Sequence, residues 1–244
     1  MVLEPDDRMK QKMTRNGSVL QYMYSVAGAG KGLAAMGGML MGIGILLSVA
    51  LFNVIGMEKA VLVAAALLVP GLLLVAAGIS MQRKRERGWA DAYTKLSGLE
   101  ERELHQVEEE FRQPGTVLFS FDKGKDSNSL KKMGFITANY IKFPGVKPFL
   151  IRLDDLVACF YTKKMLCRDG GYDRGFIAYP VAGEWSFVMD SPPEKASLEI
   201  VKLVAKHNPK VITDHFFAYE GKEYDAFGGM EEVIELHKRV YGKR

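Results

Sequence analysis

Two long runs without a charged residue constrain the fold of this chain more than any other feature. The first run extends from Gly32 to Met57 and the second from Ala60 to Met81, with only Glu58 and Lys59 between them. A helix of about 20 apolar residues spans the hydrocarbon core of a bilayer, so each run is long enough to cross. We therefore expect a two-helix transmembrane hairpin over residues 31–82.

The residues just before the first run admit another interpretation, a phosphate-binding loop around Lys31. Such a loop needs a glycine six residues before the lysine and a hydroxyl residue directly after it. Ser25 and Gly32 occupy these two positions. A cleaved signal peptide is also disfavoured, because its apolar stretch is only about 7–15 residues long. Lys31 is instead expected to anchor the first helix at the membrane surface.

Basic residues are concentrated on the two outer flanks of the hairpin, while Lys59 alone lies in the turn. The positive-inside rule therefore places both termini in the cytoplasm. We expect a multi-pass protein of a bacterial plasma membrane. Anionic lipid headgroups would be met by the flanking residues Lys31, Arg83, Lys84, Arg85 and Arg87.

Small residues recur every four positions in the first span, at Ala34, Gly38 and Gly42. This spacing puts them on one helix face, where a second helix can approach closely. The partner helix would be either the second span or a second copy of the chain in a homo-oligomer. The general abundance of glycine and alanine in membrane helices explains the pattern equally well.

The net charge of +4 does not indicate a nucleic-acid partner. The first 87 residues hold ten Lys and Arg against five Asp and Glu, whereas the remainder holds 23 against 24. The excess positive charge thus belongs to the membrane flanks, and the soluble part has no basic excess for DNA or RNA.

The segment 83–115 is expected to form connecting helices between the hairpin and a domain over 116–244, with 1–30 as a cytoplasmic N-terminal segment. The membrane helix should continue through Trp89 to Leu96. A new helix should begin after Ser97, which would be its N-cap and would form a capping box with Glu100. Leu104, Val107 and Phe111 would form its buried stripe, whereas Glu108 to Glu110 would lie on a solvated face.

Short strand-like runs follow, rich in aromatic and β-branched residues and separated by turn-forming residues. They are TVLFSF from Thr116, GFIT from Gly134, YIKF from Tyr140, PFLIRL from Pro148, DLVACFYTK from Asp155, GFIAYPV from Gly175 and EWSFVM from Glu184. Helices are expected after Ser191 and from about Gly229, with another strand in VITDHFFAY between them. The fold class is α+β: a mainly antiparallel β-meander with two C-terminal helices.

The block ITANYIKFPGVKPFLIRLDDLVACFYTKK resembles the repeated feature of bacterial pleckstrin-homology-like domains. The residues that carry the resemblance are Thr137, Tyr140, Ile141, Leu153, Asp155 and Leu156. The arrangement of two spans followed by such a domain also resembles that of two-span membrane-protein families of bacteria. The resemblance implies a seven-stranded barrel closed by one helix. The chain continues beyond that helix, so an open α+β sheet remains the alternative.

No catalytic, metal or cofactor site is predicted. The four histidines, at 105, 207, 215 and 237, are scattered, and no nucleophile motif accompanies them. Cys159 is expected in the core, and its spacing from Cys167 does not match a zinc site. A half-buried strand is the default interpretation of the C-terminal aromatic residues. The alternative is a ligand or peptide groove lined by the rings of Phe216, Phe217, Tyr219, Tyr224 and Phe227.

These observations favour a membrane-tethered binding or scaffold module that recruits a protein or a lipid headgroup. Its candidate binding surface includes Lys131, Lys132 and Lys142. One rival is a tethered enzyme, for which at least two of the histidines, Asp154 and Cys167 should meet at one cavity. The other is an oligomeric channel or transporter subunit, which the scarcity of polar residues in the spans disfavours.

Overall fold

The computed structural model describes residues 2–15, 17–24, 29–121, 130–145, 149–166, 170–183 and 186–242. The chain divides into two compact units. One comprises Tyr24–Trp89, and the other combines Met1–Met23 with Ala90–Arg244. The second unit is α+β, with antiparallel sheets and two C-terminal helices, as predicted.

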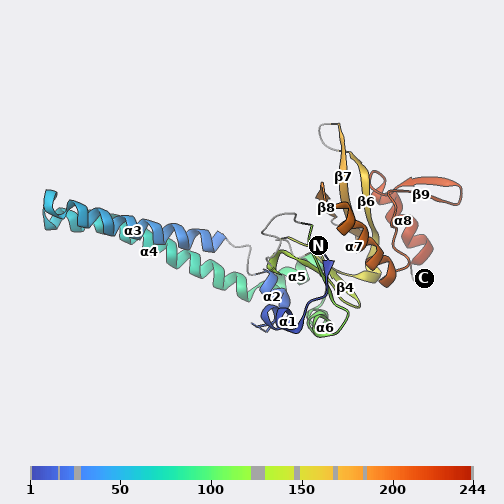
Figure 1. Cartoon of the computed structure of the whole chain (residues 1–244), viewed down its shortest axis with the longest axis horizontal. Coiled ribbons are helices and arrows are strands. Elements are labelled where there is room, and N and C mark those ends of the chain that lie inside the picture. Colours follow the sequence, from blue (N-terminus) through green and yellow to red (C-terminus); the bar gives the residue numbers. More distant parts are fainter. Residues whose placement is uncertain are drawn as a thin grey trace. The chain divides into compact units, whose positions relative to one another are not determined.

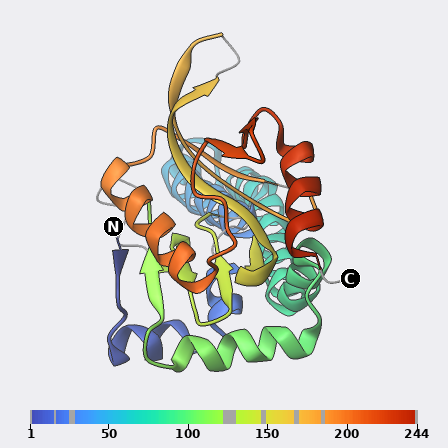
Figure 2. The same ribbon diagram turned by 90° about the vertical axis from the view of Figure 1, so that its right-hand side faces the viewer.

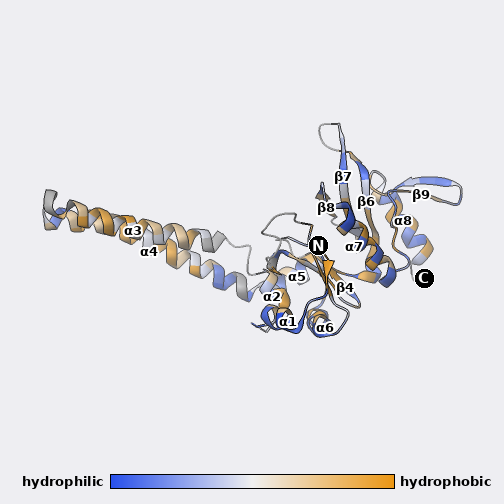
Figure 3. Ribbon diagram, viewed as in Figure 1, coloured by the Kyte–Doolittle hydropathy of each residue, from blue (hydrophilic) through white to orange (hydrophobic). Residues whose placement is uncertain are grey.

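The first unit is a hairpin of two long helices, α3 (Ala29–Ile55) and α4 (Met57–Arg87), which pack along each other (Figure 1). Both are apolar over most of their length (Figure 3). The windows Gly32–Ala50 and Met57–Lys84 have mean hydropathies of 2.1 and 2.7, and only 11% of each is buried. By length and composition, these two helices can cross a membrane.

Glycines set the close approach of α3 and α4. A Cβ atom on Gly37 would lie 2.5 Å from the carbonyl oxygen of Gly71, and one on Gly44 would lie 2.9 Å from Cβ of Leu67. A Cβ on Gly38 or Gly42 would meet nothing within 4 Å. The alternative in which Gly38 and Gly42 pack on the second span is therefore wrong. The seven-residue spacing of Gly37 and Gly44 selects the contact face instead.

Valine at position 37 should separate the two helices, because its Cβ would overlap backbone atoms of α4 that cannot move aside. We expect Gly37→Val to destabilise the hairpin by about 1–3 kcal/mol, the usual range for overpacking. The measurement is the apparent Tm of the full-length protein in detergent micelles. Gly32→Val is the matched control, because a Cβ on this glycine of α3 would meet nothing within 4 Å, and it should leave the Tm near that of the wild type. Equal losses in the two variants would contradict this packing.

In its described residues, the α+β unit has three antiparallel sheets. The five-stranded sheet has the order β1 (Val2–Leu3), β2 (Val117–Phe119), β3 (Gly134–Ile136), β4 (Tyr140–Lys142), β5 (Leu150–Arg152). The three-stranded sheet consists of β6 (Leu156–Leu166), β7 (Tyr172–Pro180) and β8 (Phe187–Asp190). The smallest is a pair, β9 (Phe216–Tyr219) with β10 (Lys222–Asp225). All seven strands predicted between residues 116 and 190 are confirmed, whereas β1 and β10 were not anticipated.

Two apolar clusters bury both faces of the three-stranded sheet. One cluster joins it to the five-stranded sheet and to α7 (Glu194–His207), through residues such as Phe143, Cys159 and Ile200. The other packs its opposite face against α8 (Met230–Tyr241) and the β9–β10 pair, through Phe160 and Val233. This explains why Val157 to Phe160 form an unbroken apolar run rather than an alternating one. The expected core position of Cys159 is confirmed.

The connecting helices begin and end elsewhere than predicted. The membrane-spanning candidate α4 ends at Arg87, and a separate helix, α5 (Trp89–Ser97), follows Gly88. The hydroxyl of Ser97 donates to the carbonyl oxygen of Tyr93, so Ser97 closes α5 rather than opening α6 (Glu101–Arg112). The capping box of α6 is shifted by three residues: the backbone N–H of Glu100 donates to Oε2 of Glu103 at 2.9 Å.

Glu108 is buried, and the expectation that it lies on a solvated face is wrong. Its Oε1 accepts hydrogen bonds from the hydroxyl of Ser18 and from the amide of Leu20, and its Oε2 accepts one from the amide of Val19 at 2.8 Å. These donors lie at the start of α2 (Val19–Tyr24), where amides lack partners within the helix. Glu108 therefore fastens α2 to α6.

Glu110 is also buried, and fastens α6 to the turn between β3 and β4. Its Oε2 accepts from the hydroxyl of Thr137 at 2.8 Å, and its Oε1 accepts from Nδ2 of Asn139 at 2.7 Å. Both glutamates flank the apolar stripe, because 108 follows Leu104 by four residues and 110 follows Val107 by three. Only Glu109, on the opposite side, is exposed as expected.

The N-terminal residues belong to this same unit. Strand β1 pairs with β2, and Nζ of Lys10, in α1 (Asp7–Met13), donates to the carbonyl oxygens of Arg112 and Gln113. The compact unit thus includes residues 1–23, α6 and all of α5 but its first residue, Trp89. This differs from the predicted division into 1–30, 83–115 and 116–244. The helical hairpin is an insertion in the sequence of the α+β unit.

Removal of the Glu108 carboxyl group should leave three buried donors without an acceptor. We expect Glu108→Ala to lower the free energy of unfolding by about 2–4 kcal/mol, from the desolvation of those groups. The measurement is chemical denaturation of the full-length protein in detergent. Glu109→Ala, one residue away and exposed, is the control and should change stability by less than about 0.5 kcal/mol. A similar loss in both variants would show that Glu108 does not fasten α2.

Candidate functional site

A pocket of about 600 Å³ opens where the ends of β6, β7, β9 and β10 meet. We call it the aromatic pocket, and it is lined by Lys164, Leu166, Tyr172, His215, Phe216, Asp225, Phe227 and Gly228. Leu166 ends β6, and Tyr172 begins β7. Figure 2 shows that these two strands extend beyond the helices of the unit. Their projecting ends expose side chains that the cores do not cover.

Three large apolar side chains of this pocket are strongly exposed. The exposed fractions are 72% for Tyr172, 58% for Leu166 and 56% for Phe216. These are the highest values for large apolar side chains among the described residues of the α+β unit. A register shift between Thr162 and Met165 separates this end of the β6–β7 pairing from the buried part. Exposed apolar clusters are typical of interaction sites.

His215 forms the inner wall of the pocket and is held on all sides. Its Nδ1 lies 2.8 Å from Oγ1 of Thr162, and its Nε2 lies 3.0 Å from Oδ1 of Asp225. The rings of Phe160 and Phe216 stack on its ring with centroids at 5.5 Å and 4.0 Å. Because the Asp225 carboxylate can only accept, Nε2–H of His215 donates to it, and in that tautomer Nδ1 accepts from the Thr162 hydroxyl.

Asp225 presents a fixed carboxylate to the pocket. Besides the His215 ring, the backbone amides of Phe227 and Gly228 donate to its Oδ1, each at 2.8 Å. Burial by itself would raise the pKa of Asp225, but the hydrogen bonds from Gly228, Phe227 and His215 leave this pKa below its usual value. The Asp225 side chain is 43% exposed. It is therefore an ionised group in contact with solvent.

Thr162, His215 and Asp225 have the residue types of a catalytic triad, but the hydroxyl residue is not accessible from the pocket. Thr162 is buried and does not line the pocket. Both ring nitrogens of His215 are engaged, so neither can take a proton from a bound substrate without breaking a hydrogen bond. This arrangement is suited to holding the wall of a binding pocket. Among the histidines, Asp154 and Cys167, Cys167 lies outside the described residues, and only His215 lines one of the described pockets.

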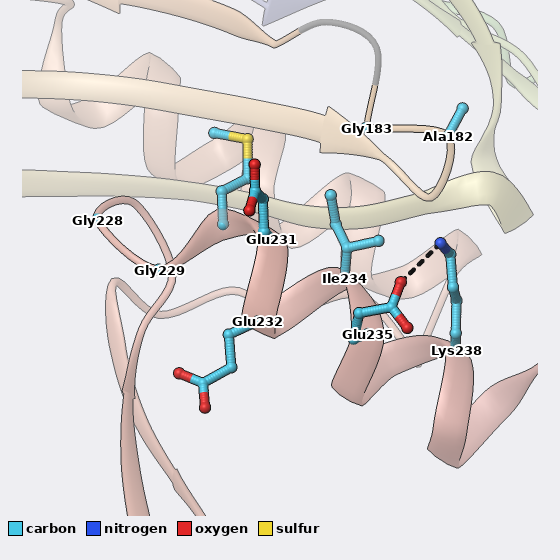
Figure 4. A pocket seen from close by; sticks show the side chains of 10 residues that line it. Ala182, Gly183, Gly228, Gly229, Glu231, Glu232, Ile234, Glu235 and Lys238 are labelled. Carbon is cyan, nitrogen blue, oxygen red and sulfur yellow. Dashed lines mark hydrogen bonds and ion pairs between the residues drawn. The ribbon is translucent and has the colours of Figure 1, made fainter.

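A second hollow, of about 790 Å³, runs along the start of α8 beside Ala182 and Gly183 (Figure 4). Acidic side chains line it, but two of them already have basic partners. Glu235 pairs with Lys238 at 2.9 Å, and Glu232 pairs with Lys222. In the described chain, no group of three or more His, Cys, Asp or Glu residues is placed to hold a metal ion. The aromatic pocket is therefore the better candidate site.

The predicted basic surface is not a single surface. Lys142 is fully buried, and its Nζ donates to the carbonyl oxygen of Phe143 at 2.9 Å. Its assignment to a binding surface is wrong, because the face of β4 that carries Lys142 is covered rather than exposed to solvent. Lys132 is exposed, whereas the side chain of Lys131 lies outside the described part.

The flank residues are described in part. Arg83, Lys84 and Arg87 are exposed near the end of α4. The side chains of Lys31 and Arg85 lie outside the described part, although both residues are helical. These positions are compatible with contact to lipid headgroups, which remains a prediction.

Sequence reasoning identified only some of the pocket residues. Phe216 and Phe227 were among the candidate groove aromatics, whereas Phe217 and Tyr224 stack on each other at the core side. Asp225 carried a usable signal, because Asp followed by Ala, Phe and two glycines favours a turn closed by the Asp side chain. Leu166 and Tyr172 carried none, since their exposure depends on which strand ends other elements leave uncovered.

Comparison with protein-family models, with curated proteins and with solved structures finds no match to this chain. The assignment of a role to the aromatic pocket therefore depends on its geometry and chemistry.

Buried Lys142 should make the stability of the protein depend on pH. Burial lowers its pKa to about 7, below the value in the unfolded chain. Between pH 7 and about 10 the unfolded state binds the proton more strongly, so stability rises with pH by roughly 1.4 kcal/mol per unit. Lys142→Met should remove this rise and stabilise the protein most at or below pH 7.

The measurement is chemical denaturation of the full-length protein in detergent at pH 7 and pH 9. Lys132→Met, at an exposed lysine, is the control and should follow the pH dependence of the wild type. A stability difference between wild type and Lys142→Met that stays constant with pH would argue against a neutral buried amine.

Proposed function

We propose that this protein is a membrane-anchored binding module that recruits a partner polypeptide to the membrane through the aromatic pocket. Helices α3 and α4 cross the bilayer, and the α+β unit performs the recognition. The observation that carries the proposal is the convergence on one pocket of Leu166, Tyr172 and Phe216, the most exposed large apolar side chains among the described residues of the α+β unit. Apolar pockets with a few fixed polar groups are typical of binding sites.

Membrane anchoring is supported by the exposure of the two apolar helices, since only a small part of each is covered by protein. The basic flanks favour an orientation with both termini in the cytoplasm of a bacterial cell, and with Arg83 to Arg87 near anionic headgroups. The α+β unit would then face the cytoplasm, where its partner would be found.

A pleckstrin-homology-like plan is the family relationship that we favour for the α+β unit. Four antiparallel strands, β2 to β5, are followed by three, β6 to β8, and then by α7. This order supports the resemblance carried by Thr137, Tyr140 and Asp155. The β9–β10 pair and α8 are additions to that plan. The β9–β10 pair supplies Phe216 and Asp225 to the aromatic pocket.

A second copy of the chain is the additional partner that we propose within the membrane. Gly38 and Gly42 face away from α4 and would allow another helix to approach. Together with Ala34, they make up the row of small residues that such a contact would use.

A charge placed in the apolar cluster should abolish recruitment. We expect Leu166→Asp to reduce partner capture at least tenfold, because an ionised group cannot enter an apolar interface without a partner. The assay is chemical crosslinking of tagged full-length protein in native membranes, followed by mass spectrometry. Leu198→Asp is the matched control, since Leu198 is an exposed leucine on α7, 42% accessible. Undiminished capture by Leu166→Asp would refute the proposal.

The full-length chain is required in this assay. A truncation that removes residues 1–87 would delete β1, α1 and α2 together with the donors to Glu108. Loss of binding in such a truncation would therefore report unfolding rather than the role of the membrane anchor.

A further inference from the structure

Three N–H donors of the aromatic pocket are already in use. The amides of Phe227 and Gly228 and the His215 ring all donate to one oxygen, Oδ1 of Asp225. An anionic ligand would need such N–H groups, which are what bind phosphate or carboxylate in backbone concavities. The remaining cation, Lys164, is on the exposed surface of β6, where solvent screens its charge. The pocket is therefore poorly equipped for anions.

The same arrangement suits a cation. Oδ1 of Asp225 carries the three hydrogen bonds from the described residues, so Oδ2 is the oxygen left for a ligand. The rings of Tyr172, Phe216 and Phe227 line the same pocket. Aromatic faces carry negative electrostatic potential and attract ammonium and guanidinium groups. A fixed carboxylate beside aromatic rings is the chemistry that recognises an organic cation.

We propose that the aromatic pocket binds a basic side chain of the partner polypeptide, a Lys or Arg next to an apolar residue. The cationic group pairs with Oδ2 of Asp225, and its aliphatic stem and the apolar neighbour lie against Leu166 and Phe216. This inference rests on the proposed recruitment function and specifies the chemistry of the partner.

A polypeptide fits these groups better than a lipid headgroup does. Zwitterionic headgroups carry a phosphate next to their ammonium group, and the phosphate would meet the Asp225 carboxylate with its nearby N–H donors already engaged. A lysine or arginine side chain carries no attached anion. Its long aliphatic stem can also cover the exposed apolar surface, as such side chains commonly do.

The test uses the full-length protein in phosphatidylcholine nanodiscs and a dye-labelled peptide of alternating Leu and Lys. A second peptide carries N-acetyl-lysine at each Lys position, which removes the charge and keeps the stem. Fluorescence anisotropy measures both dissociation constants. We expect the charged peptide to bind the wild type about fivefold more tightly or better, the difference that a partly exposed cation–carboxylate contact can supply.

Two substitutions determine the sign of the preferred charge. Asp225→Asn retains Oδ1 as an acceptor for its three donors but removes the negative charge, and should cancel the preference for the charged peptide. Lys164→Gln removes the like charge at the rim and should increase that preference. An anion site would respond to both changes in the opposite direction. If Asp225→Asn fails to fold, Lys164→Gln and the comparison of the two peptides still show whether the pocket prefers a cation.

Several results would overturn the inference. Equal binding of the two peptides would mean an apolar site without charge preference, and binding that matches empty phosphatidylcholine nanodiscs would mean adsorption to lipid. Neither result affects the proposed recruitment function, which is tested separately by comparing partner capture by Leu166→Asp with capture by Leu198→Asp. Failure of the capture assay with a retained peptide preference would instead leave a cation site that does not serve recruitment.

Discussion

Two buried glutamates on α6 hold the α+β unit together. Glu108 accepts hydrogen bonds from the amides at the start of α2. Glu110 accepts hydrogen bonds from the Thr137 hydroxyl and the Asn139 amide in the β3–β4 turn. One helix thereby joins an N-terminal segment to a sheet that follows the helical hairpin in sequence; Ser18 and Glu108 are 90 residues apart. Because buried donors without an acceptor are costly, these contacts make the N-terminal residues an obligatory part of the fold.

The aromatic pocket depends on a similar use of one carboxylate. Asp225 accepts hydrogen bonds from two backbone amides and so closes the loop after β10. It also accepts one from the His215 ring, whose other nitrogen is hydrogen-bonded to Thr162 of β6. The strand ends of β6 and β7 project past this point and leave Leu166 and Tyr172 exposed. A rigid polar wall beside an uncovered apolar rim is suited to recognition, since little side-chain entropy is lost on binding.

The sequence-based predictions were wrong about the exposure of three charged residues. Glu108, Glu110 and Lys142 each stand next to apolar residues at a spacing that is normal for a solvated face, and all three are buried. Periodicity predicts which residues share a face, but it does not state whether a second layer covers that face. Sheet and helix layers cover both faces of β4, so the alternation of Ile141 and Lys142 carries no information about exposure.

The sequence by itself determined the helical hairpin, the seven central strands and the two C-terminal helices. Each depends on local properties: absence of charge over a helix-length run, β-branched and aromatic segments, and turn residues between them. Only the tertiary structure decided which glycines of α3 meet α4, that residues 1–23 belong to the α+β unit, and that Leu166, Tyr172, Phe216 and Asp225 form one pocket. These are contacts between segments far apart in the chain, and their geometry depends on packing that local patterns do not encode.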